Sequence, residues 1–174
     1  ENSNKVTIVG THLEDKIIKK LNKNYFHPSL KSYISKKVII KSFKYLDKLL
    51  LNKPDYIVIA VSSKGIEWVC HQLIKNYKTK YSIVLLTKGL VRQKNSIKTL
   101  SNKINSIFKK KGLPKQDISS IKGPCLAIGL INKVRTSTVI ANKNINKARI
   151  LSNLISTEYY KTEISKDVNG VESL

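Results

Sequence analysis

Residues 56–61 read YIVIAV, a continuous apolar run of the kind found in strands that are covered on both faces. Residues 62–65, SSKG, then supply hydroxyl side chains that can cap a helix. Apolar side chains repeat at helical spacing over residues 66–73, and a second strand-like run follows at 82–86. A strand, a helix and a second strand of these lengths predict a βαβ unit, in which the two strands run parallel.

The same alternation extends outward from this unit in both directions. Further strands are expected at 6–9, 38–40, 118–121, 138–141 and 159–164, the last as an edge strand. Further helices are expected at 15–21, 43–51, 96–111 and 145–154. This order predicts an α/β fold with a largely parallel sheet and helices on both faces. In such a sheet, ligands bind beyond the carboxyl ends of the strands.

Length and composition restrict the class of protein further. The chain has 174 residues, the size of one domain, and its longest apolar runs are too short to span a membrane. Its two cysteines, Cys70 and Cys125, are isolated and form no metal-binding pair. These features predict a globular domain with no membrane span and no metal site, and they fit a reducing, cytoplasmic setting.

Charge is the most unusual property of the composition. The 33 Lys and Arg residues outnumber the 11 Asp and Glu residues, so the formal net charge is +22. Such a field attracts phosphate backbones, which keeps a basic nucleic-acid-binding module open as one interpretation. The basic residues are nearly all lysine, however, and they are spread through every segment without an arginine-rich block. We therefore favour compositional drift, and expect the basic surface to steer anionic ligands such as dinucleotides and sugar phosphates.

Small and basic residues follow three of the expected strands, at the edge where ligands are expected. Ser62 and Ser63 follow the first apolar run and allow a close backbone approach to a ligand at a helix start. Lys88 follows the second run and brings an ammonium to the rim of the sheet beside Gly89. Residues 123–127, GPCLA, follow the next strand and leave room for a flat ligand. Taken singly, each motif is better explained as an ordinary turn, because Gly and Ser are common in turns.

Taken together and in this order, the motifs are far more specific. They read Thr-Lys-Gly-Leu (87–90), Thr-Leu-Ser-x-x-Ile (99–104), Gly-Leu-Pro (112–114), Gly-Pro-Cys-Leu-Ala (123–127), Arg-Thr-Ser (135–137), Val-Ile-Ala-Asn (139–142) and Asp-Val-x-Gly-Val-Glu (167–172). From Ser62 to Glu172 the sequence resembles the NAD(P)-dependent glycerol-3-phosphate dehydrogenases. Gly10 and Thr11 look like the end of that family's second strand, so the resemblance covers nearly the whole chain.

The resemblance implies a Rossmann-type domain that binds NAD or NADP, followed in the intact protein by a helical substrate domain. It implies an oxidoreductase that interconverts dihydroxyacetone phosphate and glycerol 3-phosphate by hydride transfer. A homodimer is one expectation for the intact parent.

The resemblance also assigns roles to particular residues. Lys88 matches the lysine of the family's Lys-Gly motif, at the junction of cofactor and substrate, where it would take part in catalysis and in binding both. Gly123 and Cys125 match the Gly and Ser of a Gly-Pro-Ser motif near the substrate, and Ala127 matches an alanine that contacts the cofactor. The other candidate cofactor contacts are Thr11, His12, Ser62 and Ser63.

Two departures from the family pattern define the remaining expectations. The sequence contains no Gly-x-Gly-x-x-Gly turn, which binds the pyrophosphate, and it stops before the family's Ala-Leu-Lys-Asn motif with the main catalytic lysine. We therefore expect residues 1–174 to be a partial Rossmann-type domain, incomplete at its N-terminus and without the helical domain, and inactive by itself. Losing the first βα unit should also leave an exposed strand edge. The alternatives are another β-hydroxyacid dehydrogenase, a non-catalytic remnant, and the nucleic-acid-binding module.

Overall fold

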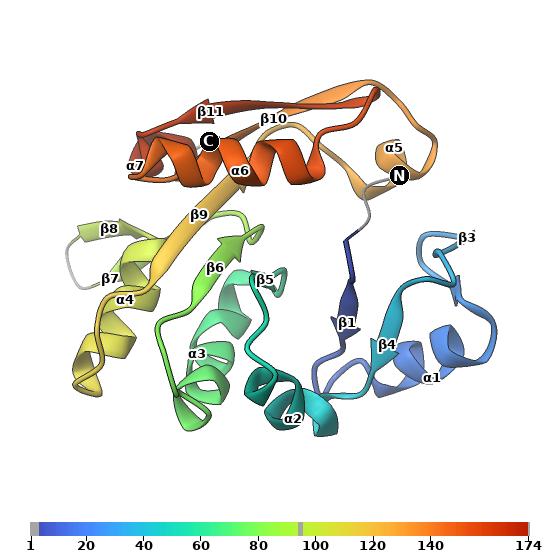
Figure 1. Ribbon diagram of the computed structural model, residues 1–174, viewed down its shortest axis with the longest axis horizontal. Coiled ribbons are helices and arrows are strands. Elements are labelled where there is room, and N and C mark those ends of the chain that lie inside the picture. Colours follow the sequence, from blue (N-terminus) through green and yellow to red (C-terminus); the bar gives the residue numbers. More distant parts are fainter. Residues whose placement is uncertain (1–3, 94–95, 174) are drawn as a thin grey trace. The chain divides into compact units, whose positions relative to one another are not determined.

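The computed structural model describes residues 4–93 and 96–173, and the chain divides into two compact units, Glu1–Lys53 and Pro54–Leu174. Within the described residues, no helix is long and apolar enough to cross a membrane. Each unit has its own strands and helices, which are labelled in Figure 1.

The first unit is a small βαβ arrangement. Strand β1 (Thr7–Val9) pairs in parallel with β4 (Ile39–Lys41), and α1 (Asp15–Asn24) lies between them in sequence. A short antiparallel pair, β2 (Phe26–His27) and β3 (Ser32–Tyr33), follows α1, and the 3-10 helix η1 (Phe43–Tyr45) and helix α2 (Leu46–Leu51) follow β4. The core consists of Ile18, Leu21 and Ile40, so the apolar face of α1 is buried against the strand pair.

Gly10 follows β1 and lets the backbone there pass close to Ile18 of α1. A Cβ at this position would lie 2.4 Å from Cγ1 of Ile18, closer than real Cβ atoms approach. The glycine is therefore required for close strand–helix packing, and not only for a turn.

The second unit contains a five-stranded sheet in the order β11-β10-β9-β6-β5. The strands are β5 (Ile57–Ile59), β6 (Ser82–Leu85), β9 (Asp117–Lys122), β10 (Thr136–Ala141) and β11 (Tyr160–Ser165). Three of the pairings, β5–β6, β6–β9 and β10–β11, are parallel, and β9–β10 is antiparallel. The predicted α/β class with a largely parallel sheet is thus confirmed.

Helices cover both faces of this sheet. Helix α6 (Ile145–Ile155) packs Ala148 and Leu151 against Val84, Ile121 and Ile140. Helix α7 (Val168–Glu172) packs against Ala141, whose side chain points to the other face because strand side chains alternate. The remaining elements are η2 (Ser63–Gly65), α3 (Ile66–Lys75), the hairpin β7 (Leu90–Gln93) and β8 (Ser96–Thr99), α4 (Leu100–Lys110) and α5 (Ala127–Ile131).

The predicted start of the helix at 96–111 was wrong. Residues 96–99 form β8, and α4 begins at Leu100 after Thr99, whose hydroxyl accepts a hydrogen bond from the N–H of Asn102. The end was correct, because Gly112 takes a positive φ of 70° just after the helix.

The expected burial of residues 56–61 on both faces was also wrong. Strand β5 is an edge strand in which Val58 is 56% exposed. By contrast, the strand expected at 118–121 lies in the middle of the sheet, with Ser120 fully buried.

Candidate active site at the carboxyl edge of the sheet

Three loops meet at one edge of the five-stranded sheet, because β5, β6 and β9 are parallel neighbours. The loops begin after Ile59, after Leu85 and after Lys122. The hydroxyl of Thr87 donates a hydrogen bond to the carbonyl oxygen of Val61 at 2.7 Å, which ties the second loop to the first. The structure therefore brings the predicted motifs after β5, β6 and β9 together.

Two lysines tie the second loop to the third. The ammonium of Lys88 donates to the carbonyl oxygen of Gly123 at 2.8 Å. In the opposite direction, the ammonium of Lys122 donates to the carbonyl oxygen of Thr87 at 2.5 Å and approaches that of Leu85 at 3.4 Å. Lys88 is exposed whereas Lys122 is only 2% exposed. Of the pair, Lys88 is thus the ammonium that solvent and a ligand can reach.

Burial shapes the electrostatics around Lys122. Desolvation lowers the pKa of Lys122 below the usual lysine value, the nearby Lys88 adds to this effect, and the Glu172 carboxylate opposes it. Glu172 is itself 2% exposed and accepts hydrogen bonds from the Ser120 hydroxyl at 2.6 Å and the Ser101 N–H at 3.0 Å. The buried carboxylate of Glu172 therefore partly offsets the cost of burying the Lys122 ammonium.

Gly123 allows the third loop to pass close to β10. Its φ is +151°, and a Cβ there would lie 3.0 Å from the carbonyl oxygen of Ser137 and from Cα of Thr138. This contact explains the glycine of the Gly-Pro-Cys motif by close backbone approach. The carbonyl oxygen of the same glycine accepts the hydrogen bond from Lys88.

Cys125 and Ala127 follow on the same loop. The Cys125 thiol is half-buried and Ala127, the first residue of α5, is exposed. Tyr160 lies close to Cys125: burial raises the pKa of Tyr160, a hydrogen bond from Thr138 opposes the rise, and Cys125 adds to it. Both loop residues are thus accessible on the segment that Lys88 touches.

Ser62 and Ser63 lie at the start of η2, after β5. The expected side-chain cap is not formed: Ser62 makes no side-chain capping bond, and its carbonyl oxygen instead accepts from the Gly65 N–H at 2.8 Å. The motif therefore sits at the expected edge, while the capping prediction for its hydroxyls was wrong.

Thr11 and His12 belong to the other unit, Glu1–Lys53. They follow β1, where the Thr11 N–H donates to the Glu14 carboxylate at 2.7 Å and the Thr11 hydroxyl accepts from the Leu13 N–H at 3.3 Å. His12 is exposed. Within that unit both residues occupy a strand-end turn, as expected.

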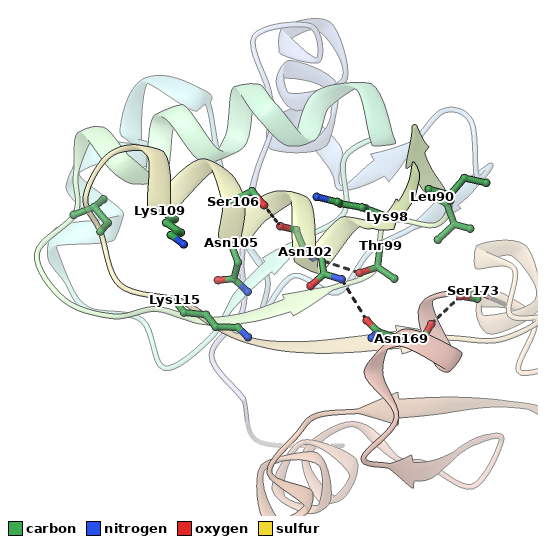
Figure 2. A pocket seen from close by; sticks show the side chains of 12 residues that line it. Leu90, Lys98, Thr99, Asn102, Asn105, Ser106, Lys109, Lys115, Asn169 and Ser173 are labelled. Atoms are coloured by element: carbon green, nitrogen blue, oxygen red, sulfur yellow. Dashed lines mark hydrogen bonds between the residues drawn. The ribbon is translucent and has the colours of Figure 1, made fainter. Parts of the chain in front are cut away.

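A separate pocket lies beside α4 and was not predicted from the sequence. Its volume is about 580 Å³, and its lining includes Lys98, Lys109 and Lys115 together with amide and hydroxyl side chains (Figure 2). One wall is formed by Asn102, which donates to Asn169 of α7 at 3.4 Å. The pocket was missed because β8, which supplies Lys98, had been assigned to a helix. Among the described residues, no cluster of His, Cys, Asp and Glu could hold a metal ion.

Taken together, the parallel strands, the helices on both faces and the loops at the carboxyl edge define a Rossmann-type nucleotide-binding domain. Solved structures share this fold. The enzyme designated DsGPDH of Dunaliella salina has a TM-score of 0.79 at 20% identity, covering 97% of this chain and 28% of that one. A glycerol-3-phosphate dehydrogenase of Coxiella burnetii has a TM-score of 0.78 at 19% identity, covering 97% and 48%.

Comparison of sequences identifies the family. Residues 1–148 match the family described as the NAD-dependent glycerol-3-phosphate dehydrogenase N-terminus, and the chain belongs to this family. An NADP(+)-dependent glycerol-3-phosphate dehydrogenase of Archaeoglobus fulgidus is 27% identical over 172 residues, which are 99% of this chain and 50% of the relative. A glycerol-3-phosphate dehydrogenase [NAD(P)+] of Clostridium botulinum is 30% identical over 133 residues, covering 76% and 38%. The chain thus spans about half the length, or less, of these two relatives.

Proposed function

We propose that the chain forms the nucleotide-binding part of an NAD(P)-dependent oxidoreductase that interconverts dihydroxyacetone phosphate and glycerol 3-phosphate. The observation that carries the proposal is the position of Lys88, an exposed ammonium between the loops that follow β5 and β9. The names of the archaeal and clostridial relatives support the cofactor class and the substrate.

In this proposal Lys88 acts on the substrate oxygen at C2. A protonated ammonium donates a hydrogen bond to that oxygen and stabilises the negative charge that develops there as the carbonyl is reduced. The loop containing Gly123 and Cys125 bounds the substrate, and Ala127 contacts the cofactor. The main acid–base lysine of the family lies beyond Leu174 in the intact protein, so Lys88 assists it.

The residues at this edge fit the nicotinamide end of a dinucleotide. A Cβ at Gly89 would meet no atom within 4 Å, so the backbone beside Lys88 is open to a flat ligand. When bound, NAD(P) would supply or accept the hydride. The resemblance to the family assigns Ser62 and Ser63 to the cofactor, and it assigns Thr11 and His12 to the recognition of the adenosine ribose. Because the sequence has no Gly-x-Gly-x-x-Gly turn, we infer that the 174-residue chain alone binds NAD(P) weakly.

The domain organisation and setting are part of the same proposal. Residues 1–174 are taken as a partial Rossmann-type domain, with the helical substrate domain outside this chain, and the intact parent as a homodimer. A cytoplasmic setting is supported by two cysteines, Cys70 and Cys125, that are free. The net charge of +22 is assigned to the steering of anionic substrates, with no nucleic-acid partner.

A substrate panel tests the proposal against its alternatives. The protein from the complete reading frame that carries this chain is assayed with NADH and NADPH against dihydroxyacetone phosphate and against ketones that correspond to other β-hydroxyacids. Preference for dihydroxyacetone phosphate supports the proposal. Preference for another ketone would indicate another β-hydroxyacid dehydrogenase, and salt-sensitive DNA binding without turnover would indicate the nucleic-acid-binding module.

A further inference from the structure

Lys122 is the buried partner in the contacts between the second and third loops, and no motif of the sequence analysis included it. It is the last residue of β9 and is 2% exposed, although lysine is almost never fully buried without a partner. Its ammonium bonds to the carbonyl oxygens of Thr87 and Leu85, at 2.5 and 3.4 Å. Both acceptors belong to the stretch that ends β6 and leads into Lys88.

We propose that Lys122 is a positioning residue, which fixes the turn that carries Lys88 so that the Lys88 ammonium stays against the Gly123 loop. The proposal rests on the proposed function of Lys88. Thr87 immediately precedes Lys88, and Gly123 immediately follows Lys122, so the two lysine bonds cross between the same two loops in opposite directions. Two such bonds fix both the separation and the direction of the loops, which one bond could not.

The turn includes one position that packing leaves open. Gly89 has a φ of +103° and open space around its Cβ position, so its backbone is free of packing contacts there. The Thr87 hydroxyl ties the turn toward β5, and Lys122 ties it toward β9. Without Lys122, the carbonyl oxygens of Leu85 and Thr87 lose a charged donor in a buried place, and the turn is expected to shift.

Two charged groups act on the ammonium of Lys122. Glu172 of α7 favours the charged form, and Lys88 opposes it. Glu172 is anchored by Ser120 of the same strand and by the N–H of Ser101 in α4. The buried carboxylate that favours the Lys122 ammonium is therefore itself fixed by two hydrogen bonds.

Selective amine labelling tests the contact directly. The complete protein and its K122M variant are treated briefly with an acetylating ester, and the labelling rate of each lysine is measured by peptide mass spectrometry. We expect Lys88 to be labelled about tenfold faster in K122M, as for the loss of one hydrogen bond to a charged group, while the rates of exposed Lys161 and Lys166 stay unchanged. An unchanged Lys88 rate, or an equal rise at all lysines, would overturn the proposal.

A double-mutant cycle in kcat separates positioning from general structural support. If Lys122 acts through Lys88, K122M lowers kcat about tenfold in the wild type, and lowers it hardly at all in the K88M background. An equal loss of kcat in both backgrounds would contradict positioning. If K88M itself leaves kcat unchanged, the proposed role of Lys88 fails, while the labelling result still decides whether Lys122 holds the turn.

A second variant covers the case in which K122M does not fold. K122R keeps a cation with several donors, so we expect Lys88 in K122R to be labelled at a rate within about twofold of the wild type. Lys88 labelling in K122R as fast as that of exposed Lys161 would contradict the proposal.

Discussion

Lys88 and Lys122 donate hydrogen bonds in opposite directions between two neighbouring segments. Lys88 donates to the carbonyl oxygen of Gly123, and Lys122 donates to that of Thr87. The first ammonium is exposed and the second is buried. In our proposal the exposed ammonium of Lys88 faces the ligand, and the buried Lys122 fixes the turn that carries it. These two bonds distinguish Lys88 from the many other lysines of the chain.

Replacing Lys88 tests its proposed part in the reaction. In the protein from the complete reading frame, we expect K88M to lower kcat for dihydroxyacetone phosphate by about a hundredfold or more, the usual range for loss of a donor that stabilises charge in the transition state. The measurement is steady-state kinetics with NAD(P)H. K161M, which changes an exposed lysine of β11, is the matched control and should behave as the wild type. Equal kinetics for K88M and K161M would refute the assignment.

Replacing Gly123 tests the close approach of the third loop to β10. In G123A the new Cβ would lie 3.0 Å from backbone atoms of Ser137 and Thr138, at a φ that side chains rarely adopt. We expect G123A to lower the free energy of unfolding by about 1–3 kcal/mol, measured by urea unfolding.

The matched control for Gly123 is Gly129 in α5. A Cβ at Gly129 would lie 3.9 Å from Cβ of Val134, an ordinary van der Waals distance. G129A should therefore be neutral or stabilise by up to about 1 kcal/mol, because alanine restricts the unfolded chain. Equal effects of G123A and G129A would show that the loop does not approach β10 as described.

The two cysteines should differ in their reaction with a thiol reagent. Cys70 is fully buried in α3, whereas Cys125 is partly exposed beside the proposed substrate. We expect one thiol, Cys125, to react in the folded protein, and C125S to abolish that reaction. In the complete protein, dihydroxyacetone phosphate with NAD(P) should slow the labelling of Cys125. Rapid modification of Cys70 without unfolding would contradict the structure.

Alkaline pH should destabilise the protein through Cys70. Desolvation by burial raises the pKa of this thiol to about 12, from the ordinary 9.0 of an exposed cysteine. Because the unfolded thiol loses its proton first, this contribution to stability is fully present below pH 9 and is lost as the pH rises toward 12. At pH 10.5 the expected loss is about 2 kcal/mol of unfolding free energy.

The variant C70A isolates this effect from other groups that titrate in the same range. The lowered pKa of Lys122 makes the free energy of unfolding rise with pH, in the range just below the usual lysine pKa. The raised pKa values of Tyr81 and Tyr160 make the free energy of unfolding fall above pH 10. Urea unfolding under reducing conditions should show a smaller loss between pH 8 and 10.5 for C70A than for the wild type. Parallel losses in both proteins would exclude the thiol as the cause.

The architecture could be predicted from the sequence because its signals are local. Apolar runs such as 82–86 and the helical repeat at 66–73 give strands and helices wherever they occur, and their alternation gives the α/β class. The hairpin of β7 and β8 was missed because residues 96–99 show no strong local strand pattern; Ile97 in it is 71% exposed. Local patterns also failed at β5, whose burial depends on which strands flank it.

The candidate site was predicted only where a motif contained the residue. Lys88 and Gly123 were found, because both belong to motifs at strand ends. Lys122 and Glu172 were assigned no role, because their partners Thr87 and Ser120 lie far away in the sequence. A lysine directly before the Gly-Pro-Cys motif, at the end of the strand expected at 118–121, was the one available signal for such a buried contact.

The most direct test of the central claim is the oxidation of NAD(P)H on addition of dihydroxyacetone phosphate. We predict turnover with formation of glycerol 3-phosphate by the protein from the complete reading frame, and none by the purified 174-residue chain. Absence of turnover by the complete protein with both NADH and NADPH would contradict the proposed function. Turnover by the 174-residue chain alone would contradict the inference that residues outside it are needed for catalysis.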